Sequence, residues 1–105
     1  MKKSLTAFLM LATTSYTMAA TTPITKITRI ITYNNVAILA ISNKAGTGCQ
    51  NNDFIAVGTG SAAGRTLYSA ALTAYTTGAK VRFGAAACYK WGSTVPYANR
   101  VELIK

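Results

Sequence analysis

The stretch SAAGRTLYSAALTAYTTGAKVRF, residues Ser61 to Phe83, decides the fold because it contains a helix, a stop signal and a strand in succession. Ser61 is a good N-cap residue, and Gly78 can adopt the left-handed conformation that closes a helix C-terminus. Residues at intervals of three and four predict one buried helix face: Gly64, Leu67, Tyr68, Ala71, Leu72 and Tyr75. From Lys80 to Phe83 apolar and basic residues alternate, which indicates a strand with one solvated face.

The segments before this helix are typical of strands. Ile24 to Tyr33 is rich in Ile and Thr, Asn34-Asn35 suits a two-residue turn, and Val36 to Ile41 is a short apolar run. These three features together predict a hairpin. A polar loop from Asn43 to Asn52 follows, and Phe54 to Val57 is predicted to be a third strand before a glycine-containing turn enters the helix.

Two or three more strands are expected after the helix. They are Lys80 to Phe83, Ala87 to Trp91 and Arg100 to Ile104, with a turn over Gly92 to Pro96. Three strands, a helix and two or three strands is the order of the OB-fold, a small five- to six-stranded Greek-key barrel. The predicted fold class is therefore mainly β with one helix, an OB-fold. A small α+β sheet capped by one helix is the alternative.

The N-terminus is predicted to be a secretion signal over residues 1 to 19. Lys2 and Lys3 precede an apolar run around Ala7 to Ala12, and small residues precede an expected cleavage after Ala19. The run is shorter than the roughly 20 apolar residues of a membrane span, so no membrane span is expected. We expect a secreted or periplasmic protein with a single OB-fold-like domain over residues 20 to 105.

Cys49 and Cys88 are the only cysteines of the chain. An even cysteine count in an exported protein favours a disulfide between them, and the alternative is a pair of reduced, buried thiols. In the chain-entropy model, closing a loop of about 40 residues removes roughly 4 kcal/mol of unfolded-state freedom. Because the chain has no histidine, two thiols are too few ligands for a zinc site, and neither a metal nor a cofactor is expected.

The charged residues argue against catalysis and in favour of anionic partners. Asp53 and Glu102 are the only acids, so the paired acid and base that hydrolysis needs cannot be assembled without lysine. Ser61 and Lys80 are better explained as a helix cap and a strand-face charge, and we expect a non-enzyme without catalytic residues. Once Lys2 and Lys3 are removed, nine basic residues oppose two acidic ones, a net charge of about +7 in a basic protein.

Four aromatic residues are candidates for ligand binding: Tyr33, Tyr89, Trp91 and Tyr97. In OB-folds that bind single strands, aromatic side chains stack on bases while basic residues follow the backbone. The alternative is that Tyr89 and Trp91, beside Cys88, are core and rim residues. One hypothesis is therefore an exported module that binds single-stranded nucleic acid or another polyanion, and another is a docking or regulatory subunit of a secreted partner.

A resemblance to a known family is concentrated in Thr66 to Phe83. Thr66-Leu67-Tyr68, Ala71-Leu72, Tyr75-Thr76-Thr77-Gly78 and Val81-Arg82 resemble the helix and following strand of the subtilase cytotoxin B subunit family. The resemblance implies an OB-fold subunit of an AB5 toxin, which forms a homopentamer, binds sialylated cell-surface glycans and carries an A subunit. It therefore implies a secreted, non-catalytic binding module.

The glycan pocket of that family is not matched in this sequence. The family uses a serine early in its first strand and tyrosine after the strand that follows the helix. When the match is extended without gaps, the position of the family's serine falls near Thr22 or Pro23 of this chain. Gly84 and Ala85 stand at the positions of the family's tyrosine. No glycan-binding residue of the family is therefore assigned to this chain.

Overall fold

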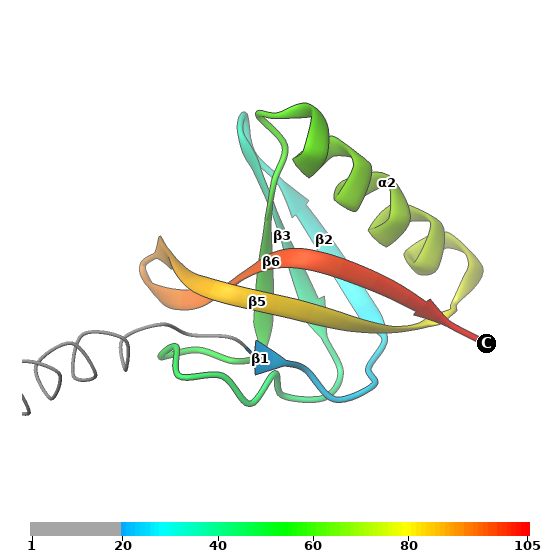
Figure 1. Cartoon of the computed structure of the whole chain (residues 1–105), viewed down its shortest axis with the longest axis horizontal. Helices are drawn as coiled ribbons and strands as arrows, with labels where there is room; N and C mark the ends of the chain where they lie inside the picture. Colours follow the sequence, from blue (N-terminus) through cyan, green and yellow to red (C-terminus); the bar gives the residue numbers. More distant parts are fainter. Residues whose placement is uncertain (1–19) are drawn as a thin grey trace, which may run out of the picture.

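The computed structural model describes residues 20–105, so the predicted secretion signal lies outside the described residues. The described chain contains six strands and one helix (Figure 1). In chain order they are β1 (Ala20–Thr21), β2 (Ile27–Thr32), β3 (Val36–Ile41), β4 (Phe54–Gly58), α2 (Ala62–Thr77), β5 (Lys80–Trp91) and β6 (Ser93–Ile104). The prediction of a mainly β protein with one helix is confirmed.

The strands form one mixed sheet in the order β1-β5-β6-β4-β3-β2. All neighbouring strands are antiparallel except β4 and β6, which are parallel at Ala56 and Tyr97. The edge strands β1 and β2 do not pair with each other, so the sheet is open. Where the segment before β2 meets β5, Thr25 and Val81 exchange two backbone hydrogen bonds of 2.8 Å as an isolated antiparallel bridge.

The first hairpin forms as its sequence predicts. β2 and β3 pair up to Thr32 and Ala37, and the Tyr33 amide donates to the Val36 carbonyl oxygen at 2.8 Å to close the turn. Val36–Ile41 is a continuous apolar run because its two faces are both buried. Ala37, Leu39 and Ile41 belong to the main core, and Val36 and Ile38 to a second cluster on the other face.

The strands after the helix differ from their prediction. β5 runs from Lys80 to Trp91 without the expected break at the alanine run, and β6 begins at Ser93, so the predicted turn over Gly92 to Pro96 is wrong. Only Gly92, at φ +73°, turns the chain. Alanine is less frequent in strands than β-branched or aromatic residues. Here the alanine run is nevertheless extended, because Ala85 and Ala87 pair with β6, with register shifts at Gly84/Ala85 and Ala85/Ala87.

The helix begins and ends where the sequence predicts. The Ser61 hydroxyl accepts a hydrogen bond from the Gly64 amide at 3.1 Å, and Gly78 follows the last turn at φ +73°. The predicted buried face is partly wrong. Ala71 and Ala74 are buried, and Leu67 and Tyr68 pack half-buried against the core, whereas Leu72 and Tyr75 are 37% and 43% exposed.

Two glycines permit close packing around the start of the helix. A Cβ atom on Gly64 would overlap the carbonyl oxygen of Gly58, and one on Gly58 would overlap the hydroxyl of Tyr97. Gly64 therefore allows the first turn of α2 to approach the end of β4. Gly58 in turn allows the Tyr97 ring to lie over that strand.

The main core lies between α2 and one face of the sheet. Its largest buried side chains are Leu39, Ile55, Val57, Val81 and Phe83. The second cluster lies on the opposite face and consists of Val36, Ile38, Ala56 and Val95, with Ile31, Phe54, Tyr89 and Trp91 packed against it. Val95, Tyr89 and Trp91 of this cluster come from the end of the β5–β6 hairpin, whose turn points away from α2 (Figure 1), so the end of the hairpin covers this face.

The β5–β6 hairpin also carries an ion-pair cluster centred on Glu102. Arg82, its cross-strand partner, lies at 2.9 Å, and Arg100 of the same strand lies at 2.8 Å. The hydrogen bond from the Arg82 guanidinium, together with the positive charges of both arginines, holds the pKa of Glu102 below its ordinary value of 4.5, against the opposing effect of burial.

The lowered pKa predicts a specific pH dependence. A carboxylate whose folded-state pKa is lowered stabilises the fold above its unfolded pKa and loses that contribution as the pH falls through the folded value. We expect Glu102→Gln to be less stable than the wild type at pH 7 and the difference to shrink below about pH 4.5. Urea unfolding at pH 7, 5 and 3 measures this, and a difference that stays constant down to pH 3 would contradict it.

Candidate ligand-binding site

A hollow of about 540 Å³ opens between the β2–β3 turn and the end of β5. We call it the aromatic pocket, and its lining residues are Thr32, Tyr33, Asn34, Asn35, Val36, Tyr89 and Trp91. Three of the four aromatic residues predicted as ligand-binding candidates therefore lie around one hollow. They come from separate elements, because Tyr33 precedes the β2–β3 turn whereas Tyr89 and Trp91 belong to β5.

Contacts among the aromatic side chains fix their relative positions. The Trp91 indole Nε1 donates a hydrogen bond to the Tyr33 hydroxyl at 3.2 Å. The fourth candidate, Tyr97, does not line the pocket but stacks behind Tyr89, with ring centroids 5.7 Å apart and an interplanar angle of 17°. Phe54 meets Trp91 edge to face at 5.1 Å, a geometry that aromatic pairs prefer.

The polar groups of the aromatic pocket are neutral. Asn34 and Asn35 contribute side-chain amides, and Thr32 and Tyr33 contribute hydroxyls. Arg29 lies nearby, 6.0 Å from the centre of the Phe54 ring, but it does not line the hollow. Tyr33 is 50% exposed, so one ring of the pocket is accessible to a ligand from solvent.

Sequence reasoning missed two contributors to this site. Asn34-Asn35 was interpreted only as a turn, although the same two side chains line the hollow. Phe54 was interpreted only as the start of a strand, although its ring supports Trp91. The alternation of β4 could have found Phe54, since Ile55 and Val57 point to the main core and leave Phe54 for the other face.

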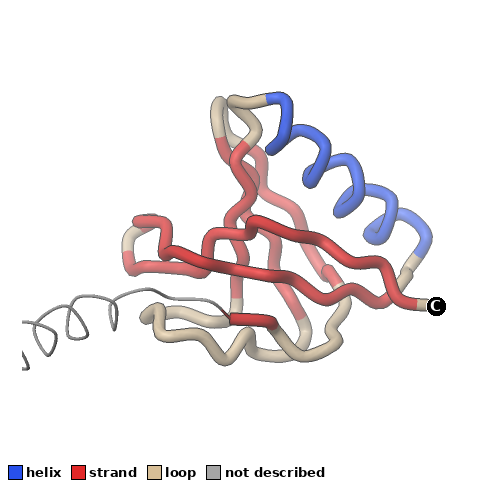
Figure 2. Tube along the Cα trace, in the orientation of Figure 1, coloured by secondary structure: helices blue, strands red, loops and turns tan. Residues whose placement is uncertain are grey.

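The long loop between β3 and β4, tan in Figure 2, is cross-linked to the hairpin that carries Tyr89 and Trp91. The predicted disulfide between Cys49 and Cys88 is confirmed and joins this loop to β5. Beside the disulfide, the backbone amide of Gln50 donates a hydrogen bond to the Thr94 hydroxyl at 2.9 Å, and the backbone amide of Thr94 donates one to Gln50 Oε1 at 2.9 Å. The Asn51 amide donates to the Thr94 carbonyl oxygen at 2.8 Å.

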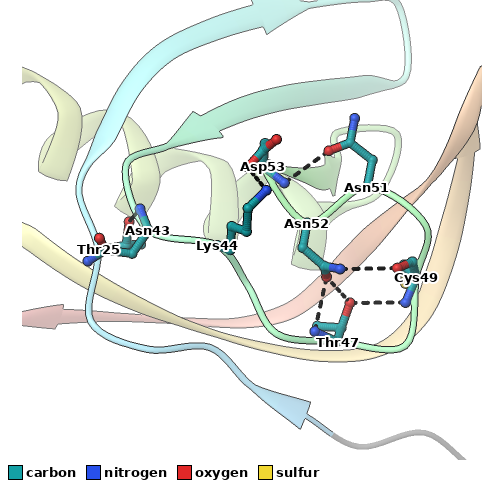
Figure 3. A network of polar contacts seen from close by, with 8 residues as sticks. All are labelled: Thr25, Asn43, Lys44, Thr47, Cys49, Asn51, Asn52 and Asp53. Carbon is teal, nitrogen blue, oxygen red and sulfur yellow. Dashed lines mark hydrogen bonds and ion pairs between the residues drawn. The ribbon is translucent and has the colours of Figure 1, made fainter.

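Within the loop, Asn52 is the centre of a polar network (Figure 3). Asn52 Oδ1 accepts a hydrogen bond from the Thr47 backbone amide at 3.0 Å and a second one from the Thr47 hydroxyl. Asn52 Nδ2 donates to the Cys49 carbonyl oxygen at 3.1 Å. Lys44 and Asp53 form an ion pair of 3.0 Å at the end of the loop. Side-chain hydrogen bonds of this kind replace the backbone ladder that the loop lacks, so the loop is a defined anchor for the hairpin.

The start of the described chain lies beside the middle of β5. Thr21 pairs with Gly84, and both line a hollow of about 150 Å³ without aromatic residues. Thr22 is buried, and its hydroxyl accepts from the Phe83 amide at 2.9 Å and donates to the Pro23 carbonyl oxygen at 3.1 Å. The Thr22 hydroxyl is therefore used within the fold.

Both acidic residues are engaged in ion pairs, Asp53 with Lys44 and Glu102 with two arginines. Over residues 20–105, no group of three or more potential metal ligands lies together, and no helix is long and apolar enough to cross a membrane. Neither protein-family models nor curated proteins nor solved structures match this chain. The geometry of the aromatic pocket is therefore the basis on which a function is proposed.

Proposed function

We propose that this protein is a secreted, non-catalytic module that binds carbohydrate in the aromatic pocket. The observation that carries the proposal is the convergence of three aromatic rings with two side-chain amides around one hollow: Tyr33, Tyr89, Trp91, Asn34 and Asn35. A sugar ring presents an apolar face of C–H groups and an edge of hydroxyls. Aromatic faces match the first and amides the second, in the mixture typical of small-ligand sites.

The charge distribution favours carbohydrate over nucleic acid at this site. Binding of a polyanion requires cations that follow the backbone beside the stacking aromatic residues. The pocket lining contains no charged residue, and the nearby Arg29 faces Phe54. An exported module for single-stranded nucleic acid therefore remains the alternative that the binding experiment must exclude.

Several features support an OB-fold, which is an architecture that binds oligosaccharides and oligonucleotides. The helix lies between the third and fourth strands of the five-stranded unit β2 to β6, and the bridge between Thr25 and Val81 curls the sheet toward closure. The disulfide between Cys49 and Cys88 supports an oxidising compartment, as expected of a secreted or periplasmic protein. The absence of histidine from the sequence and the pairing of both acids support a role without catalysis.

The proposal predicts that removing the exposed aromatic ring weakens glycan binding. A glycan array first identifies a ligand, and the fluorescence of Trp91, the single tryptophan, then reports titration with the free oligosaccharide. We expect saturable binding that persists at physiological salt. Tyr33→Ala should lower the affinity roughly tenfold or more, equivalent to about 1.4 kcal/mol, because it removes an exposed aromatic face on which a sugar ring would stack.

Leu103→Ala is the matched control, since Leu103 is 44% exposed and lies outside the lining of the pocket. Equal losses in Tyr33→Ala and Leu103→Ala would contradict the assignment of the site. Binding to a single-stranded oligonucleotide alone, with a steep dependence on salt, would instead establish the polyanion alternative. If neither ligand binds, a docking or regulatory subunit becomes the function to pursue.

We also propose that the protein assembles into a homopentamer that carries an A subunit, as the family resemblance implies. Along α2, Arg65 is the only charged residue, and Leu72 and Tyr75 are exposed on its surface. An uncharged surface of this kind is suited to burial against another copy. Several weak glycan sites in one ring would gain avidity from being linked.

The assembly is tested by light scattering at tens of micromolar protein. We expect the mass of five chains for the wild type and a smaller mass for Leu72→Asp/Tyr75→Asp, because two carboxylates would have to be buried without partners. Thr21→Asp/Thr28→Asp provides the control with the same change of charge on exposed positions of the sheet outside the aromatic pocket. A monomer mass for the wild type would contradict the assembly and leave the glycan proposal intact.

A further inference from the structure

Two lysines occupy opposing positions at the bridge that links the two ends of the sheet. Thr25 and Val81 form an antiparallel bridge, so Lys26 and Lys80 face each other one step beyond it. Both line a second hollow, of about 230 Å³, together with Ile24, Thr25, Ser42 and Asn43. This hollow is remote from the aromatic pocket along β5, since Lys80 is the first residue of that strand and Trp91 the last.

The charges of these two lysines are not compensated within the described chain. Like charges directly opposite each other on neighbouring strands destabilise the pairing. The ion pairs among residues 20–105 engage Asp53 with Lys44 and Glu102 with two arginines, and none includes Lys26 or Lys80. The repulsion therefore acts beside the isolated bridge between Thr25 and Val81, and no ion pair among residues 20–105 offsets it.

The polar residues that line the hollow with the two lysines are held in place by hydrogen bonds. The Thr25 and Ser42 hydroxyls form a hydrogen bond with each other at 3.2 Å. The backbone amide of Asn43 donates to Thr25 Oγ1 at 2.9 Å. Figure 3 shows Asn43 beside Thr25, at the start of the long loop. One N–H of the Asn43 side chain donates to the Ile24 carbonyl oxygen at 2.8 Å, which leaves its second N–H as a donor.

We propose that the hollow between Lys26 and Lys80 binds a tetrahedral oxyanion, either as free sulfate or phosphate or as the corresponding ester group of a larger ligand. Two ammonium groups and an amide N–H supply charge-assisted and neutral hydrogen bonds to its oxygens. The bound anion also removes the repulsion between the lysines. The volume of about 230 Å³ far exceeds the roughly 30 Å³ share of one water, so a five-atom group has room to enter.

The test uses backbone amide NMR of residues 20–105 during titration with sodium sulfate, against sodium chloride at equal ionic strength. We expect saturable shifts that are specific to sulfate and centred on Lys26, Ser42, Asn43 and Lys80. A parallel titration compares N-acetylglucosamine 6-sulfate with N-acetylglucosamine. Shifts with both sulfates indicate an oxyanion site in general, and shifts with the sulfated sugar alone indicate a subsite for an esterified ligand. Either result supports the proposal.

Matched variants separate a defined site from the general attraction of a basic protein for anions. Lys26→Gln/Lys80→Gln should lower the sulfate affinity about tenfold or more, equivalent to about 1.4 kcal/mol. Lys90→Gln/Lys105→Gln removes the same charge outside the hollow and should change the affinity less than about twofold. Equal losses in both variants would overturn the proposal, and so would identical responses to sulfate and chloride combined with identical responses to the sulfated and the unsulfated sugar. If the first variant fails to fold, Lys80→Gln alone provides the comparison, and the outcome of glycan binding at the aromatic pocket has no bearing on either result.

Discussion

The link between the long loop and the β5–β6 hairpin is the constraint on which the candidate site depends. The aromatic pocket needs Tyr33 from the first hairpin and Trp91 from the second, two residues whose strands are not neighbours in the sheet. The disulfide at Cys88 and the hydrogen bonds at Thr94 fasten the second hairpin on both of its strands. They hold the hairpin over the sheet face on which the Trp91 indole meets the Tyr33 hydroxyl.

This arrangement also explains how a small domain buries both faces of part of its sheet. The helix covers one face through Ala71 and Ala74, flanked by Leu67 and Tyr68, and the end of the β5–β6 hairpin covers the other. Domains of this size bury only about 60% or slightly more of their unfolded surface, so a covalent cross-link offsets a limited core. The aromatic side chains at the edge of the second cluster are half-buried as a result, which leaves their rings available to a ligand.

Local signals in the sequence were sufficient for the helix from its cap at Ser61 to Gly78, for the first hairpin and for the disulfide. They were insufficient where tertiary pairing overrides propensity, as in the alanine run of β5, which β6 holds in an extended strand. Composition and spacing suggested four aromatic candidates, of which Tyr33, Tyr89 and Trp91 line one hollow. They could not show that Tyr33 meets Trp91, because those residues are 58 positions apart and only the tertiary structure brings them together.

Hydrogen exchange on Cys49→Ala/Cys88→Ala under native conditions tests the central claim most directly, namely that the loop fastens the hairpin carrying the aromatic pocket. The account predicts that amides from Lys90 to Thr94 exchange at least about tenfold faster in the variant, because local opening of this hairpin becomes easier. Amides of β2 and β3 should keep most of their protection. Unchanged exchange from Lys90 to Thr94, or equal acceleration throughout β2 and β3, would contradict the account.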